Sequence, residues 1–75
     1  MNSNLQTFID SIDADAYDYI IELSNAFYID NNNKELTNSQ LQYIAYKTNK
    51  YFDTDYTDDD IFDFIHEFIK AITAE

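Results

Sequence analysis

Apolar residues recur along the chain at the three- and four-residue spacing that places side chains on one face of a helix. The first such stretch is short and follows Ser3 or Asn4, either of which is a suitable helix cap. Its apolar positions are Leu5, Phe8, Ile9 and Ile12. The spacing predicts a short N-terminal helix with one buried face.

A second and longer helix is predicted from Asp13 or Asp15 to about Ile29. Its expected core positions are Ala16, Tyr19, Ile20, Leu23, Ala26 and Phe27. A second arc of the same helix carries Tyr17, Ile21, Ser24 and Tyr28. The two arcs together cover more than half of the circumference, so we expect this helix either to be packed on two sides or to form part of an interface.

A polar loop over residues 30–35 separates this helix from the next. Thr37 and Gln40 have the spacing of a capping box, and Leu36 and Leu41 occupy the hydrophobic-staple positions around it. The third helix is expected to continue to about Phe52. Its predicted buried positions are Leu41, Ile44, Ala45, Thr48, Tyr51 and Phe52.

The same helix-start signals recur after residues 53–55. Thr57 is the expected cap, Asp60 stands at the reach-back position, and Tyr56 and Ile61 are the staple pair. The fourth helix is predicted from Asp58 to about Ala74, with Ile61, Phe64, Ile65, Phe68, Ile69 and Ile72 inward. The pattern predicts an all-α fold, a compact bundle of three long helices plus a short N-terminal helix, as a single acidic helical domain over residues 1–75.

The sequence contains no glycine, no proline and no cysteine. Helices joined by Asn and Asp loops tolerate this composition better than β-hairpins do, because Asn and Asp adopt the left-handed conformation that tight turns require. Without cysteine, disulfides and thiolate metal sites are excluded. The N-terminal residues lack a signal-peptide pattern, and no apolar run reaches the ~20 residues of a membrane span, so we expect a cytoplasmic protein, in the host-cell cytoplasm if it is phage-encoded.

Charge is the most unusual feature of the composition. Fifteen carboxylates against four lysines, with no arginine, give a formal net charge of −11. Small domains usually carry a net charge of about 2–8 in magnitude. A strongly negative protein repels nucleic acid and anionic membranes and is attracted to basic surfaces. We therefore expect no direct nucleic-acid or membrane contact, a basic nucleic-acid-binding protein as partner, and either a monomer or a homodimer.

The acidic residues form rows on the predicted helices. On the fourth helix, Asp59, Asp60, Asp63 and Glu67 are expected to share the face opposite the core, and on the second helix Asp15, Asp18 and Glu22 form a similar row. Like charges one turn apart destabilise a helix by roughly 0.2–0.5 kcal/mol per pair. Carboxylates in a first helical turn are favoured by the helix dipole, but Asp18, Asp63 and Glu67 lie beyond it. We interpret the rows as partner-binding surface; the alternative is a solvated face that promotes solubility.

A stripe of different character is predicted on the outer face of the third helix. Tyr43, Tyr46, Lys47 and Lys50 have i, i+3, i+4 and i+7 spacing. Exposed tyrosines are effective interface anchors because they present a large area with little side-chain entropy. We therefore include Tyr43 and Tyr46 among the candidate partner-binding residues, and ordinary surface tyrosines are the alternative.

Two loops and one histidine contain residue types that occur in chemical sites. Asp30 and Asn32 open a stretch that resembles half of an EF-hand, but Glu35 replaces the required glycine and Gln40 replaces the bidentate acid, so no calcium site is expected. Residues 53–57 match the DxDxT pattern of haloacid-dehalogenase-like phosphatases but follow a helix instead of a strand. His66 has no nucleophile or metal-ligand partners in the pattern. We therefore expect neither enzymatic activity nor a cofactor, metal or catalytic site.

In size, charge, Asp, Tyr and Phe content and lack of cysteine, the whole chain resembles small acidic phage-encoded inhibitors, among them DNA-mimicking anti-restriction and anti-CRISPR proteins. The resemblance implies a non-enzymatic inhibitor whose acidic rows occupy the basic groove of a nuclease or another nucleic-acid-binding effector, with an affinity that falls as salt rises. The alternative is an acidic protein–protein adaptor or regulatory module, such as a degenerate EF-hand-like domain without calcium binding. An adaptor would bind through its tyrosine-bearing faces, either Tyr17, Ile21 and Tyr28 or Tyr43 and Tyr46, and its binding would depend less on salt.

Overall fold

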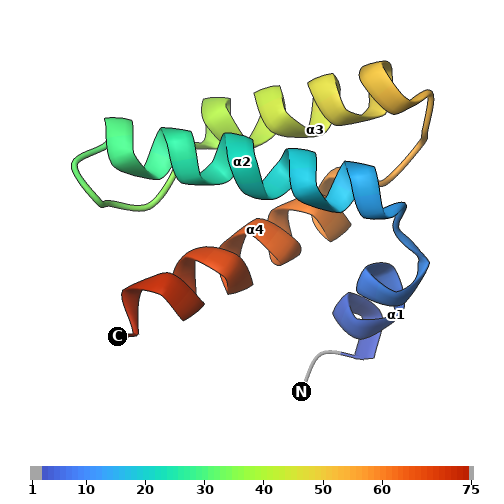
Figure 1. Cartoon of the computed structure of the whole chain (residues 1–75), viewed down its shortest axis with the longest axis horizontal. Helices are drawn as coiled ribbons and strands as arrows, with labels where there is room; N and C mark the ends of the chain where they lie inside the picture. The colour runs from blue at the N-terminus through green and yellow to red at the C-terminus, as the bar shows by residue number, and fades with distance from the viewer. Residues whose placement is uncertain (1–2, 75) are drawn as a thin grey trace.

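The computed structural model describes residues 3–74, and every regular element in this part of the chain is a helix. The helices are α1 (Ser3–Ser11), α2 (Ala14–Asp30), α3 (Asn38–Phe52) and α4 (Asp58–Thr73) (Figure 1). The predicted all-α bundle with a short N-terminal helix is confirmed. Because α1 already includes both of its predicted cap residues, its N-cap lies outside the described residues.

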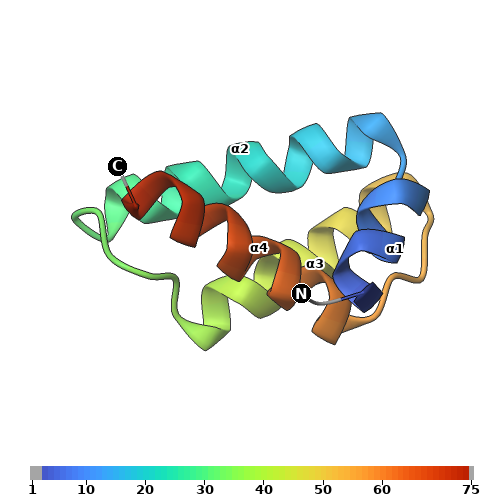
Figure 2. The ribbon, with the colours of Figure 1, turned by 90° about the horizontal axis from the view of Figure 1, so that it is seen from below.

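The three long helices pack against one another in pairs, and α1 packs against α4. α2 and α3 lie side by side, α4 crosses both of them, and α1 lies near the start of α4 (Figures 1 and 2). The molecule measures 31 × 28 × 19 Å along its principal axes. None of the described helices combines the length and the apolar character that a membrane span requires.

One apolar core joins all four helices. Its members are Phe8, Ile20, Leu36, Leu41, Ile44, Ala45, Ile61, Phe64, Ile65 and Ile69. Four isoleucines, one in α2, one in α3 and two in α4, are at most 1% exposed. Burying one such side chain stabilises the fold by roughly 1.5–3 kcal/mol, so these positions contribute most to holding the long helices together.

The buried side of α2 is rotated relative to the sequence expectation. Ala26, predicted in the core, is exposed, whereas Ser24 of the second arc is completely buried. α4 packs along this second arc, where the rings of Tyr17 and Phe64 lie 5.0 Å apart. α2 is therefore packed on two sides, between α3 and α4. Tyr51 of α3 was also predicted to be buried, but it is 72% exposed.

Side-chain caps begin the long helices where the sequence predicted them. Asp13 caps α2, and Thr37 forms the complete capping box with Gln40 at the start of α3. At the start of α4, the Thr57 hydroxyl accepts a hydrogen bond from the Asp60 backbone N–H (3.2 Å). Among the described residues the reciprocal bond, in which the Thr57 backbone N–H would donate to the Asp60 carboxylate, is not formed, because the aspartate side chain is one methylene shorter than that of glutamate.

Asparagine and aspartate carry out the loop functions for which most chains use glycine. Asn32, Asn33 and Asp53 have φ values of 60°, 63° and 54°, in the left-handed region. The side chain of Asn49 organises the connection between α3 and α4: its amide donates to the Tyr56 carbonyl (2.8 Å), and its oxygen accepts from the Tyr56 N–H (2.9 Å). These bonds fix the start of α4 without a glycine or proline turn.

Candidate partner-binding surface

The acidic row of α2 lies on the solvent side of that helix. Asp15, Asp18 and Glu22 are all exposed, as predicted, and the buried Ile20 projects away from them. The row extends over eight residues, from Asp15 to Glu22, which is about 10 Å along the helix axis. Three carboxylates therefore lie in line along one exposed edge of the bundle.

The beginning of α4 is the most densely charged segment of the structure. Five carboxylates fall between Asp58 and Glu67, an axial distance of about 13–14 Å at 1.5 Å per residue. This amounts to roughly one charge per 3 Å of helix axis, close to the ~3.4 Å per phosphate along one strand of B-DNA. The segment thus matches a nucleic-acid strand in axial charge density.

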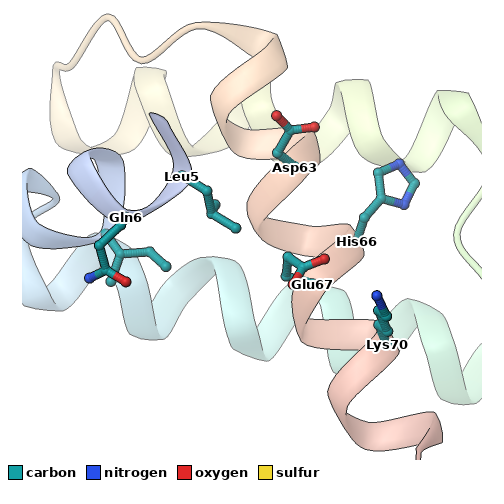
Figure 3. Close-up of a pocket in the computed structure, with 7 residues that line it drawn as sticks. Leu5, Gln6, Asp63, His66, Glu67 and Lys70 are labelled. Atoms are coloured by element: carbon teal, nitrogen blue, oxygen red, sulfur yellow. The ribbon is translucent and has the colours of Figure 1, made fainter. Parts of the chain in front are cut away.

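The packing of α1 against α4 separates the predicted row of acidic residues on α4, so that its members border different hollows. Asp63 and Glu67 of α4 line a hollow of ≈ 540 Å³ between α1 and α4 (Figure 3). The other residues around this hollow are Leu5, Gln6, Ile9, His66 and Lys70. The hollow combines an apolar side on α1 with a mostly charged side on α4. Such a site fits a long basic side chain, which lays its aliphatic stem on apolar surface and its charge against carboxylates.

The remaining members of the α4 row lie elsewhere. Asp60 is half-buried and lines a separate hollow beside Thr57 and a different face of α1. Asp59 is exposed. The prediction of a single face shared by all four acids is therefore wrong in detail: three of them are exposed, and the packing of α1 turns the fourth into a partly covered position.

The lysines do not neutralise these carboxylates internally. Among residues 3–74, no lysine lies within ion-pair distance of a carboxylate. The Lys50 amine instead donates to the Tyr46 hydroxyl (3.2 Å) and lies 5.5 Å from the centre of that ring. The Lys47 amine lies 6.0 Å from the centre of the Tyr43 ring. The exposed carboxylates of α2 and α4 therefore carry charge that no described lysine neutralises.

The outer side of α3 presents the predicted tyrosines together with one that was not predicted there. Tyr43, Tyr46 and Tyr51 are 47%, 60% and 72% exposed. The Tyr51 ring stacks on Tyr19 of α2, with centroids 5.3 Å apart and an interplanar angle of 16°. We call the surface formed by Tyr43, Tyr46, Lys47, Lys50 and Tyr51 the tyrosine–lysine face. The i, i+4, i+8 spacing of Tyr43, Lys47 and Tyr51 was the sequence signal that could have placed Tyr51 on it.

The loop that resembles half of an EF-hand has its polar groups engaged with one another. The Asn31 amide donates to the Gln40 side-chain oxygen (2.7 Å), and the Gln40 amide donates back (3.1 Å). The same Gln40 oxygen accepts from the Thr37 N–H (2.9 Å), completing the capping box. Gln40, at the position of the missing bidentate acid, is therefore a structural residue of the loop.

The phosphatase-like pattern and His66 lie where the fold does not support the chemistry that the patterns resemble. Asp53, the first residue of the phosphatase-like pattern, is the C-cap of α3 and does not follow a strand. His66 is exposed at the hollow between α1 and α4. Within residues 3–74, no group of three or more His, Asp or Glu side chains could hold a metal ion. Comparisons of the chain with protein-family models, with curated proteins and with solved structures find no match.

Proposed function

We propose that this chain is a non-enzymatic acidic inhibitor that binds the basic nucleic-acid-binding surface of a target protein. It would act as a DNA mimic with which a phage blocks a restriction or CRISPR system of its host. The observation that carries the proposal is the set of exposed carboxylates on α2 and α4 that no described lysine neutralises. The lysines and arginines of a basic groove normally form charge-assisted hydrogen bonds with phosphates. They can form the same kind of bond with the carboxylates of such a surface.

The structure of α4 supports this proposal in two ways. Asp59, Asp63 and Glu67 are exposed at successive turns of α4, about 6 Å apart along the helix axis, so three basic side chains of a groove would each find a carboxylate within reach. The hollow between α1 and α4 adds a pocket in which Asp63 and Glu67 accompany Leu5 and Ile9. An arginine at the edge of a nucleic-acid groove would bury its stem there and form charge-assisted hydrogen bonds with the carboxylates.

An adaptor function is the second candidate, and the tyrosine–lysine face is the observation that favours it. The other surface considered for an adaptor, the second arc of α2, is largely occupied: Ile21 and Tyr28 pack against the core beside α4. An adaptor would therefore bind through α3. Its affinity would depend on Tyr43 and Tyr46 and would respond little to salt.

The two functions are separated by a pair of triple variants with equal charge. Asp59→Asn, Asp63→Asn and Glu67→Gln remove three charges from α4. The control, Asp10→Asn, Glu35→Gln and Asp53→Asn, removes the same three charges from α1 and the loops. Binding would be measured by interferometry against a panel of purified restriction enzymes and CRISPR effector complexes, at several salt concentrations.

The proposal predicts that the α4 variant loses at least about tenfold in affinity for its target while the control loses much less, because the α4 carboxylates contact the groove and the three control carboxylates do not. Both variants should remain folded, since the changed side chains are exposed. Equal losses in both variants would show that only total charge matters. Unchanged binding by the α4 variant, combined with loss on Tyr46→Ala, would establish the adaptor function instead.

A further inference from the structure

The outer side of the α2–α3 pair has carboxylates along one edge and amines along the other. On α2 the edge is the exposed row of Asp15, Asp18 and Glu22. On α3 the edge contains Lys47 and Lys50, and no residue of this helix carries a carboxylate. No lysine in the described part of the chain forms an ion pair with a carboxylate, so the two edges keep opposite and uncompensated charges.

Aromatic rings separate the two edges. Tyr51 of α3 stacks on Tyr19 of α2, and farther along the pair Tyr43 of α3 meets Phe27 of α2 edge-to-face at 5.8 Å. We call these four rings the aromatic seam. A hollow of ≈ 320 Å³ opens beside Tyr19 and Tyr51, and the two lysines of α3 complete its lining. The seam therefore offers ring surface directly beside the positive edge.

The acidic row borders the seam on the α2 side. Asp15 is four residues before Tyr19 and Glu22 is three residues after it, so both are its neighbours on the helix surface. Both α4 and α1 lie on one side of the α2–α3 pair, and among residues 3–74 no element covers the opposite side (Figures 1 and 2). This uncovered side presents three parallel strips, of carboxylates, rings and amines.

We propose that this surface binds an amphipathic helix of a partner protein, with a basic edge against the α2 row, an apolar stripe on the aromatic seam and an acidic edge against the α3 lysines. A wholly basic partner would place its charge against Lys47 and Lys50, and a wholly acidic partner would place its charge against the α2 row. A second copy of the chain would bring a further net charge of −11. A helix with segregated charges and little net charge matches both edges at once.

The dimensions of the surface suit one helix. Two packed helices lie about 8–10 Å apart, which leaves a shallow groove for a third helix of about 10–12 Å diameter. From Tyr19 to Phe27 the seam extends about 12 Å along α2, roughly two turns of a bound helix. Tyr43 and Tyr51 are exposed, and their contacts with α2 already order them, so they lose little rotamer freedom on binding. Asp58 borders Lys50 from the start of α4 and keeps the positive strip narrow.

This inference goes beyond the proposed function and does not depend on it. Asp63 and Glu67 line the hollow beside α1, outside the three strips, so a helix bound to α2 and α3 leaves them uncovered. The α2 row is the one feature that both proposals use. The tests therefore change the lysines of α3 or the carboxylates of α4, which belong to one proposal each.

Two synthetic peptides of about 15 residues, roughly 22 Å of helix, test the charge match. Both have the same composition, with a leucine stripe and equal numbers of arginine and glutamate. In the first peptide, arginines occupy one edge of the stripe and glutamates the other; in the second, the two are interspersed along both edges. In fluorescence anisotropy with the full chain, the segregated peptide should bind at least about tenfold more tightly, and salt of about 0.5 M should reduce this preference.

Charge reversal on α3 tests the positive edge. Lys47→Glu with Lys50→Glu should weaken binding of the segregated peptide at least about tenfold. Lys34→Glu with Lys70→Glu is the matched control, because it makes the same change in net charge with the two other lysines, which are exposed and lie outside α2 and α3. Lys50→Glu alone, at an exposed position, repeats the test if the half-buried Lys47 does not tolerate the change. The α4 triple variant should bind the peptide as the wild type does, so failure of either proposal is recognised separately.

The inference is overturned if the segregated peptide does not bind at about 1 mM protein or if the interspersed peptide binds equally well. Equal effects of the two lysine pairs, with both variants folded by circular dichroism, would also overturn it. Loss of peptide binding by the α4 triple variant would place the contact on α4 instead. A dimer of the free chain in sedimentation equilibrium that Lys50→Glu dissociates would assign the surface to a second copy and contradict the proposal.

Discussion

Ser24 provides a sharp test of the packing of α2. Its side chain is completely buried between α2 and its neighbours, and its hydroxyl is the one buried side-chain oxygen or nitrogen of the described residues that has no hydrogen-bond partner. A buried hydroxyl without a partner destabilises the folded state by about 1–3 kcal/mol relative to a hydrated one. Ser24→Ala removes this group and leaves the β-carbon in place.

The expected gain in the free energy of unfolding can be worked out term by term. Loss of the unpaired hydroxyl contributes about 1–3 kcal/mol, and the better helix propensity of alanine adds a few tenths. The space left by one oxygen atom, roughly 10–15 Å³, subtracts about 0.3 kcal/mol. These terms sum to a stabilisation of about 1–3 kcal/mol, and we expect the lower end of that range. For a chain of 75 residues, each kcal/mol raises Tm by about 4–8 °C.

Thermal and urea unfolding followed by circular dichroism would measure the change, with two controls. Ser39→Ala makes the same substitution at an exposed position in the first turn of α3, where no buried hydroxyl is removed. Thr48→Val removes a buried hydroxyl that does have a partner, the Ile44 carbonyl at 2.7 Å, and should give no gain. The reasoning is refuted if Ser24→Ala lowers stability, or if it gains no more than Ser39→Ala.

Two further predictions concern the ions around the protein. Raising salt from about 0.02 M to about 0.5 M should increase Tm. The carboxylates of residues 3–74 have no lysine partners, so screening by salt relieves their mutual repulsion. A flat or falling Tm would contradict this prediction. About 1 mM calcium should leave Tm where a chelator leaves it, because Asn31 and Gln40 are hydrogen-bonded to each other and no ligand cage closes around the loop; a rise of several degrees would show binding.

The helices could be predicted from the sequence because their determinants are local. Periodicity placed the inward positions of α4, and Thr37 and Thr57 marked two helix starts to the residue. The orientation of α2 could not be derived in the same way. Both of its arcs are apolar, so only packing against α3 and α4 decides that Ser24 is buried and Ala26 is exposed.

The candidate surface was predictable in composition but not in shape. Helical spacing correctly placed Asp59, Asp63 and Glu67 outward, whereas the half-burial of Asp60 and the hollow beside Asp63 depend on where α1 packs. That contact joins residues more than fifty positions apart in the chain, which no local pattern reports. Tyr51 is a different case, because its i, i+4, i+8 spacing with Tyr43 and Lys47 indicated the outer face of α3, where it is exposed.

Competition with nucleic acid is the measurement that tests the proposed function most directly. Cleavage by a nuclease target would be followed with the protein at fixed concentrations while the DNA concentration is increased. If the carboxylates of α2 and α4 occupy the DNA groove, inhibition is competitive: excess DNA restores full activity, and the inhibition constant rises with salt. Inhibition that excess DNA does not relieve would place the contact outside the nucleic-acid groove and contradict the proposal.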